Sequence, residues 1–173
     1  MNFDLDKSIL ILQRTPVVLE QLLSGLPDDW VMHNEGGETW SPYDIVGHLL
    51  HGEKTDWMTR TKMILDGEHK TFPVFQRTAM FEESKGKTLS DLLAEFKSAR
   101  AENLKTIVSL NLTDKDFNKT GIHPKFGKVT LRQLLSTWTI HDLTHLAQIS
   151  RVMAKQYKAE IGPWIEFFRV LQD

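Results

Sequence analysis

Three histidines of the chain lie at positions from which they could bind one metal ion. His141 and His145 are four residues apart in the segment TLRQLLSTWTIHDLTHLAQISRVMAKQY, residues 130–157. On a helix this spacing places the two imidazoles on one face, about 40° apart around the axis and about 6 Å apart along it. Such a pair can share a metal ion, as in zinc-protease helices, although a chain with seven histidines often contains one such pair by chance.

The stripe that contains this pair gives it more weight than its spacing alone. A series of mainly apolar residues recurs in the segment at steps of three and four, the inward-facing pattern of a bundle helix: Leu131, Leu134, Trp138, His141, His145, Gln148 and Val152. A polar group buried without partners costs about 1–3 kcal/mol, so the imidazoles and the amide need partners in the interior. A metal ion would satisfy the imidazoles, and Gln148 could bind a metal-activated water or a substrate.

His48 supplies a third imidazole from another helical segment. It lies between Ile45 and Leu49 on the inward face of that segment, and Gly52, one turn further on, is expected to leave space beside the site. Three neutral imidazoles from two facing helices are a common ligand set of catalytic metal sites and leave other coordination positions open. The alternative is a structural bundle whose core histidines are satisfied by hydrogen bonds.

Other polar residues near these positions have less specific interpretations. His51 is displaced about 60° around the helix from the third candidate ligand, and we expect it to be a poorer ligand. Asp142 directly follows a candidate ligand and therefore points elsewhere, either to support an imidazole from behind or to cap a neighbouring loop. Glu53 is rotated well off the inward face, which is typical of a surface carboxylate.

The remaining histidines fall in predicted loops. His33 and His69 are expected to be solvated, and His123 is expected to stabilise the GIHPKFG loop in which it lies. We find no Ser-His-Asp constellation, phosphate-binding loop or dinucleotide fingerprint in the chain.

Helical periodicity dominates the chain, and no segment shows strand alternation bounded by hairpin turns. The first helix is predicted over about residues 6–26, where Pro16 interrupts it, and Thr15 and Pro16 can restart it as N-cap and first-turn residue. The second is predicted over about residues 42–65, because Ser41 and Pro42 form a strong N-terminal signal.

A connection over residues 68–87 follows, and its length is typical of a crossover or a lid. The third helix is predicted to begin near Thr88 or Ser90, with an inward face of Leu89, Leu92, Leu93, Phe96, Leu104, Ile107 and Leu110. A loop over residues 121–127 leads to the fourth helix, capped at Thr130. A short last helix is expected to begin at Pro163 and to dock on the body through Trp164, Phe167, Phe168 and Leu171.

Four main helices with one long connection predict an all-α four-helix bundle in a single domain, residues 1–173. The chain has 173 residues, a net charge of −2 and no cysteine, which excludes disulfides, thiolate ligands and a cysteine nucleophile. The charge gives no footprint for nucleic acid. The absence of a signal peptide and of a bilayer-length apolar run predicts a cytoplasmic protein without a membrane partner.

Three segments together resemble the DinB superfamily: WSPYDIVGHLLHGE, GIHPKFGKVTLRQLL and TWTIHDLTHLAQISRVMAKQY. With the later GPW, residues 162–164, the resemblance extends over nearly the whole chain. It implies a bundle in up-down-down-up order with a long crossover between the second and third helices. It also implies a divalent metal ion held by His48, His141 and His145, and a homodimer.

Relatives in this superfamily include bacillithiol transferases, mycothiol-dependent maleylpyruvate isomerases and proteins called metal-dependent hydrolases. The resemblance therefore favours an enzyme that uses Zn²⁺, Ni²⁺ or Mn²⁺ to transfer a low-molecular-weight thiol to an electrophile. Since the chain has no cysteine, the sulfur would come from a small-molecule co-substrate. The alternatives are a hydrolase that uses a metal-activated water and a non-catalytic module that binds a metal or a small ligand.

Overall fold

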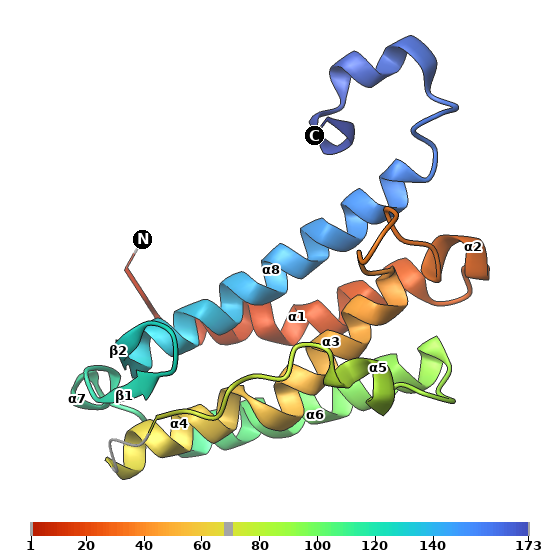
Figure 1. Ribbon diagram of the computed structural model, residues 1–173. Coiled ribbons are helices and arrows are strands. Elements are labelled where there is room, and N and C mark those ends of the chain that lie inside the picture. Colours follow the sequence, from red (N-terminus) through yellow and green to blue (C-terminus); the bar gives the residue numbers. More distant parts are fainter. Residues whose placement is uncertain (1, 68–70, 173) are drawn as a thin grey trace.

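The computed structural model describes residues 2–67 and 71–172. Four long helical rods form a bundle (Figure 1): α1 (Leu5–Leu23), α3 (Pro42–Thr55) continued by α4 (Trp57–Asp66), α6 (Leu89–Ser109) and α8 (Leu131–Lys155). The first and last rods run in one direction, and the second and third run in the other. This is the predicted up-down-down-up order, and the predicted four-helix bundle is confirmed.

Shorter elements lie between the rods: α2 (Asp28–Val31), α5 (Ala79–Glu83), α7 (Asp114–Phe117), β1 (Thr120–His123) and β2 (Gly127–Thr130). Two 3₁₀ helices, η1 (Gly162–Phe167) and η2 (Arg169–Leu171), follow the last rod. Helices α1 and α3 each pack against both α6 and α8, so α1 and α3 occupy opposite corners of the bundle. Because α3–α4 and α6 are parallel, the connection between them must return along the length of the bundle, as Figure 1 shows.

The predicted helix starts are confirmed by their capping contacts. Ser41 caps α3 and Thr88 caps α6, each with an aspartate at the third helical position that reciprocates the contact. Thr130 caps α8 in the same way with Gln133. In each case two backbone N–H groups that the helix leaves unpaired find side-chain acceptors, so these residues fix where the site-bearing helices begin.

Pro16 does not interrupt the first helix, contrary to the sequence prediction. Helix α1 continues through it, and the Thr15 hydroxyl, expected to cap a new helix, lies 3.3 Å from the Ile11 carbonyl. A proline in a helix leaves the carbonyl four residues earlier without its usual donor. Here that carbonyl belongs to Leu12, and the guanidinium of Arg100 donates to it at 2.7 Å. A contact from another helix therefore replaces the missing hydrogen bond.

The predicted second helix is divided into α3 and α4 at Asp56, whose backbone angles are φ −111° and ψ −68°. The chain is helical again from Trp57, and α4 ends at Asp66. The next residue, Gly67, caps the helix in a left-handed conformation with φ 71°. A glycine in this conformation is a common helix terminator. The predicted end near this glycine is therefore confirmed.

The predicted loop over residues 121–127 is instead part of an antiparallel hairpin, in which Thr120 pairs with Thr130 and His123 with Gly127. Thr71 adds an isolated bridge to Ile122, so the hairpin contacts the crossover. Gly121 is required there because a Cβ at this position would overlap the ring of Phe72. Each strand has four residues, the shortest length over which alternation can indicate a strand.

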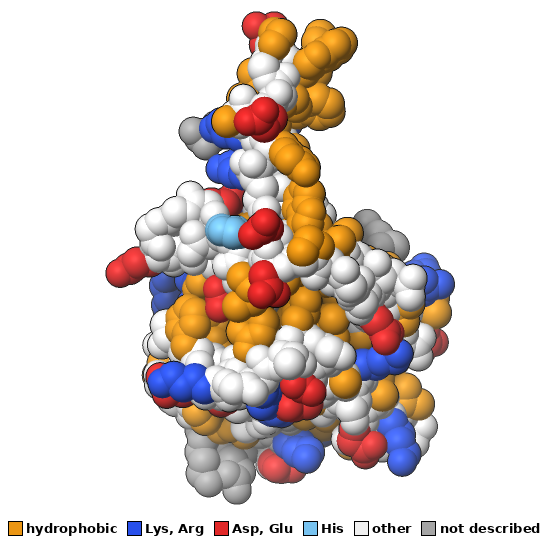
Figure 2. Space-filling view, turned by 90° about the vertical axis from the view of Figure 1, so that its right-hand side faces the viewer, with side chains coloured by type: hydrophobic (Ala, Val, Ile, Leu, Met, Phe, Trp, Pro, Cys, Tyr) orange, Lys and Arg blue, Asp and Glu red, His pale blue; other side chains and the backbone are white. Residues whose placement is uncertain are grey.

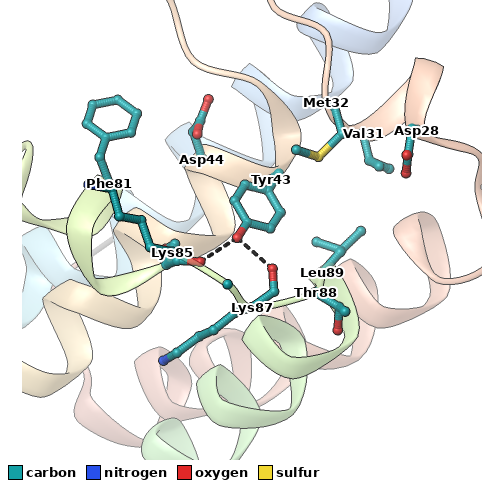
Figure 3. A pocket seen from close by; sticks show the side chains of 12 residues that line it. Asp28, Val31, Met32, Tyr43, Asp44, Phe81, Lys85, Lys87, Thr88 and Leu89 are labelled. Carbon is teal, nitrogen blue, oxygen red and sulfur yellow. Dashed lines mark hydrogen bonds between the residues drawn. The ribbon is translucent and has the colours of Figure 1, made fainter.

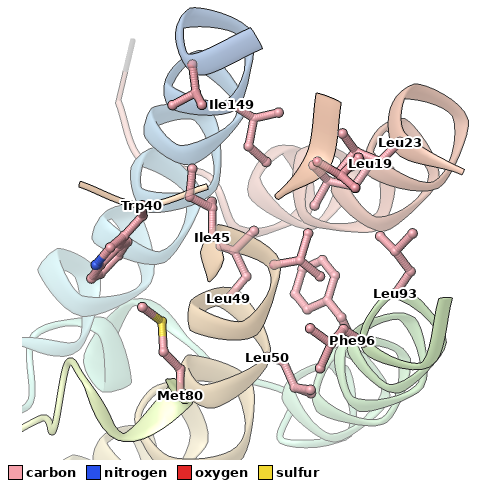
Figure 4. Packing of buried hydrophobic residues seen from close by; sticks show 14 residues of the cluster. Leu19, Leu23, Trp40, Ile45, Leu49, Leu50, Met80, Leu93, Phe96 and Ile149 are labelled. Carbon is pink, nitrogen blue, oxygen red and sulfur yellow. The ribbon is translucent and has the colours of Figure 1, made fainter. Parts of the chain in front are cut away.

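The core consists of apolar side chains from all four rods (Figure 4). Leu19 and Leu23 of α1 meet Phe96 of α6 and Ile149 of α8 in one cluster, and a second cluster lies around Trp138. Leu110, which was expected on the inward face of the third helix, is not part of the core. It lies just past the end of α6 and is 37 % exposed.

The C-terminal segment docks much less than expected. Of the four residues predicted to hold it on the body, only Leu171 is buried, whereas Trp164, Phe167 and Phe168 are exposed. The segment projects from the end of α8 (Figure 1) and carries hydrophobic side chains on its surface (Figure 2). Among the described residues, no helix has the length and apolarity needed to cross a membrane.

Candidate metal centre

The structure brings together the three histidines that the sequence singled out. His48 of α3 faces His141 and His145 of α8 across the bundle. The Nε2 atom of His141 lies 3.0 Å from Nε2 of His48 and 3.2 Å from Nε2 of His145. One ligand atom from each of the three residues lies within 4.8 Å of the others. Three nitrogens therefore converge on one point in the interior.

Burial keeps these imidazoles neutral. Burial, followed by the neighbouring imidazoles, lowers the pKa of His48 to about 2, and burial, followed by His145 and the charge of Arg100, lowers that of His141 to about 3. The pKa of His145 is also lowered by burial, although Gln148 and the charge of Asp142 oppose the shift. Neutral imidazoles are the form that binds metal ions. The donor set thus fits a divalent ion chemically as well as geometrically.

Gln148 supports His145 rather than facing the site as a ligand. Its Oε1 lies 2.8 Å from Nδ1 of His145. The amide oxygen can only accept, so Nδ1 carries the proton and Nε2 keeps its lone pair for the site. The Nδ1 atoms of His48 and His141 have no such partner among the described residues. Of the three rings, therefore, only that of His145 is held by this kind of contact in the described part of the chain.

Aromatic side chains enclose the three imidazoles. The ring of Trp40 lies 4.7 Å from that of His48, the Trp57 ring lies 5.2 Å from that of His141, and Phe75 packs edge-on against His48 at 5.5 Å. Phe75 comes from the crossover, so this segment forms part of the wall around the site.

Gly52 does not leave the empty space that the sequence analysis expected. The indole of Trp57 fills it: a Cβ added at Gly52 would lie 3.3 Å from the indole nitrogen. The missing side chain therefore lets Trp57 pack beside His141 instead of opening a cavity.

His51 lies outside the three-histidine cluster, in agreement with its lower rating as a ligand. Its Nδ1 lies 2.9 Å from a carboxylate oxygen of Glu83 in α5. The ring lines a cavity of about 300 Å³ between α3–α4 and the crossover, together with Arg60 and Phe75. His51 thus faces a separate polar pocket, divided from His48 by Phe75.

The remaining histidines behave largely as predicted. Nδ1 of His123 accepts hydrogen bonds from the backbone N–H groups of Lys125 and Phe126, which stabilises the hairpin turn. His33 is exposed. His69 lies outside the described residues.

Glu53 was misread from the sequence, because it is buried rather than on the surface. The side chain of the fully buried Asp142 bonds to Arg100 and not directly to an imidazole, although its charge raises the pKa of His145. Both carboxylates bind Arg100, which is 1 % exposed. Helical spacing did contain the signal: Arg100 falls in the inward series Leu93, Phe96, Arg100, Leu104 and Ile107, at steps of three and four.

A cavity at the other end of the crossover has no histidine in its lining. It has a volume of about 420 Å³ and lies between α2, the start of α3 and the segment after α5 (Figure 3). The Tyr43 hydroxyl lies 2.8 Å from the Ser84 carbonyl and 2.9 Å from the Lys87 carbonyl. These contacts tie the end of the crossover to α3, so the cavity marks an anchoring point.

Comparison with known proteins identifies the family. The sequence profile of the DinB superfamily matches residues 11–149, whereas no curated protein sequence matches the chain. Among solved structures the chain is similar to YfiT from Bacillus subtilis, described as a probable metal-dependent hydrolase with an unusual four-helix bundle topology. The TM-score is 0.75 and the identity 23 %, over 90 % of this chain and 87 % of that one. The chain therefore belongs to the DinB superfamily.

Proposed function

We propose that the protein is an enzyme that holds a divalent metal ion through His48, His141 and His145. The observation that carries this proposal is the convergence of three neutral, buried imidazole nitrogens within 4.8 Å. Membership of the DinB superfamily and the description of YfiT as a probable metal-dependent hydrolase support it. A divalent ion bound there would lower the pKa of a thiol or a water and so supply a nucleophile at neutral pH.

The surrounding residues prepare the site for such chemistry. Gln148 holds His145 in the tautomer whose Nε2 is free to bind. Trp40, Trp57 and Phe75 limit access of bulk water, and a low dielectric strengthens electrostatic interactions with a reacting group. Three protein ligands leave coordination positions for a co-substrate.

The reaction we favour is transfer of a low-molecular-weight thiol to an electrophile. The chain has no cysteine, so a thiolate nucleophile must be bound from solution as a co-substrate. The resemblance to bacillithiol transferases supports this class of substrate. The candidate ions are Zn²⁺, Ni²⁺ and Mn²⁺, because three imidazoles suit several first-row ions.

Hydrolysis by a metal-activated water is the second candidate, and the description of YfiT as a probable metal-dependent hydrolase favours it. Phe75 separates His51 from His48, so His51 is not the base for this water.

Metal analysis tests the site itself. The wild-type protein, purified without chelator, should contain a stoichiometric divalent metal by plasma mass spectrometry. His48→Ala, His141→Ala and His145→Ala should each lose it, whereas His33→Ala, which removes an exposed histidine, should not. Metal-free wild-type protein that takes up no Zn²⁺, Ni²⁺ or Mn²⁺ on titration would refute the proposal.

Turnover assays separate the two reactions. The loaded protein can be incubated with bacillithiol and monochlorobimane, and in parallel with p-nitrophenyl acetate in the absence of thiol. Thiol transfer predicts loss of the thiol that depends on protein and metal. Ester cleavage without thiol that is lost in His48→Ala together with the metal would instead favour hydrolysis.

A further inference from the structure

A buried ionic cluster crosses the centre of the bundle. The guanidinium of Arg100 in α6 contacts both oxygens of Asp142 in α8, at 2.6 and 2.9 Å, and Oε1 of Glu53 in α3 at 2.8 Å. It also donates to the Leu12 carbonyl of α1. The cluster therefore joins all four rods, including the two that carry the histidines.

The carboxylate of Glu53 is bound by further donors. Trp138 Nε1 lies 2.9 Å from Oε1, and Asn103 Nδ2 lies 2.9 Å from Oε2. The contacts to Glu53 and Asp142 come from N–H donors, and both carboxylates form salt bridges with Arg100. Two carboxylates against one guanidinium give this cluster of Arg100, Glu53 and Asp142 a net charge of −1.

An excess charge in the interior is unfavourable unless an opposite charge lies near it. The cluster is close to the three histidines along two routes. Asp142 directly follows His141 in the sequence. From Glu53 the route runs through Trp138, which stacks on Trp57 at 5.8 Å, and Trp57 contacts the His141 ring. The histidines themselves are neutral, so they do not balance the charge.

We propose that the cluster of Arg100, Glu53 and Asp142 supplies counter-charge for the divalent ion held by His48, His141 and His145. The inference rests on the proposed metal site and extends it to residues that touch neither the ion nor its ligands. Glu53 and Asp142 act at a distance and do not take part in the reaction, so they are positioning and electrostatic residues.

The test compares charge-neutralising variants with a variant that removes a hydrogen bond but no charge. Glu53→Gln and Asp142→Asn each remove the excess negative charge at nearly constant shape. Asn103→Ala removes a donor to Glu53 and leaves the charge of the cluster unchanged. The Kd for Zn²⁺ is measured on the full chain by competition with a chromophoric chelator, after circular dichroism has established which variants fold.

We expect Zn²⁺ affinity to fall about tenfold or more in Glu53→Gln and Asp142→Asn, the size of effect seen when groups behind metal ligands are changed. In Asn103→Ala it should stay within about threefold of wild type, well below that effect. The visible spectrum of the Co²⁺-loaded protein should keep its band positions in both neutralised variants, because the ligand geometry is unchanged. If only one neutralised variant folds, that variant decides.

Two results would overturn the inference. One is an unchanged affinity in the neutralised variants. The other is an equal loss in Asn103→Ala, or an altered Co²⁺ spectrum, which would show that the cluster acts through geometry alone. Failure of wild-type protein to bind Zn²⁺ or Co²⁺ would instead refute the metal site itself, so the two proposals fail in different ways.

Discussion

At the scale of single residues, Gln148 is the side chain that decides which nitrogen His145 presents to the site. Removing its amide oxygen leaves the ring free to rotate or to change tautomer. We expect Gln148→Leu to weaken Zn²⁺ binding about tenfold with little change in the free energy of unfolding. Gln148→Glu keeps an acceptor at the same place and should retain most of the affinity. Chelator competition measures both.

Ser150→Ala is the matched control for this prediction, because Ser150 is exposed on the same helix. An affinity for Zn²⁺ in Gln148→Leu equal to that of Ser150→Ala would contradict the role given to Gln148.

For single residues, the sequence predicted the candidate site where a polar side chain interrupts the apolar stripe of a predicted helix. His48, His141 and His145 were found in this way, and the structure brings them together. Arg100 also interrupts an apolar stripe, but a single long cation is usually read as solvated. Its partners come from three other helices, and no local pattern predicts such pairing.

At the scale of elements, α1 depends on Arg100 to tolerate Pro16. A proline inside a helix costs about 3 kcal/mol, partly through the lost hydrogen bond to the Leu12 carbonyl. Since Arg100 already occupies that carbonyl, we expect Pro16→Ala to raise the free energy of unfolding by less than this amount. Arg100→Lys removes the guanidinium that donates to the Leu12 carbonyl. In that background, Pro16→Ala should raise the free energy of unfolding by about 1 kcal/mol more than it does in the wild type.

Urea unfolding of the wild type, the two single variants and the double variant gives this coupling as a double-mutant cycle. Additive effects of the two substitutions would show that Arg100 does not compensate for the proline. A measurable coupling would explain why the helix continues where sequence reasoning expected a break.

The hairpin of β1 and β2 depends on the absence of a side chain at Gly121. A Cβ there would overlap Phe72 and lie 2.9 Å from Ile64 Cγ1. We expect Gly121→Ala to lower the free energy of unfolding by about 1–3 kcal/mol, as overpacking does. Adding Phe72→Leu should recover part of this loss, as measured by thermal unfolding. A loss that Phe72→Leu leaves unchanged would point to backbone strain instead.

The elements that sequence reasoning predicted well are the long ones. Periodicity over many residues and capping residues such as Ser41 and Thr130 located the bundle helices. The hairpin escaped because its strands have four residues each. The docking of Trp164 and Phe167 was predicted wrongly because apolar residues are usually buried, whereas here both are exposed. A local sequence pattern does not tell whether other residues of the same chain cover such side chains.

At the scale of the whole molecule, the C-terminal segment exposes several large apolar side chains. Trp164 is 64 % and Phe167 76 % exposed, and the segment stands clear of the bundle (Figure 2). Exposed apolar patches of this kind mark interaction sites. We expect the protein to form a homodimer that covers them.

The double substitution Trp164→Ser, Phe167→Ser should convert this dimer into a folded monomer, because neither side chain contributes to the buried core. Sedimentation equilibrium measures the mass, and circular dichroism checks the fold. Val108→Ser, which changes an exposed apolar residue on α6, should leave the mass unchanged. A monomeric wild type, or a double variant that stays dimeric, would contradict the prediction.

The parallel course of α3–α4 and α6 has a consequence for how this architecture can diversify. The returning segment passes over the site, with Phe75 on His48 and Arg77 over Trp40, yet it carries none of the three imidazoles. Mutation can lengthen, shorten or rewrite it while the ligand-bearing helices stay as they are. The bundle and its metal ligands can then stay constant during evolution while the sequence of the returning segment varies. Substitutions in that segment can therefore change the substrate preference without any substitution in the core.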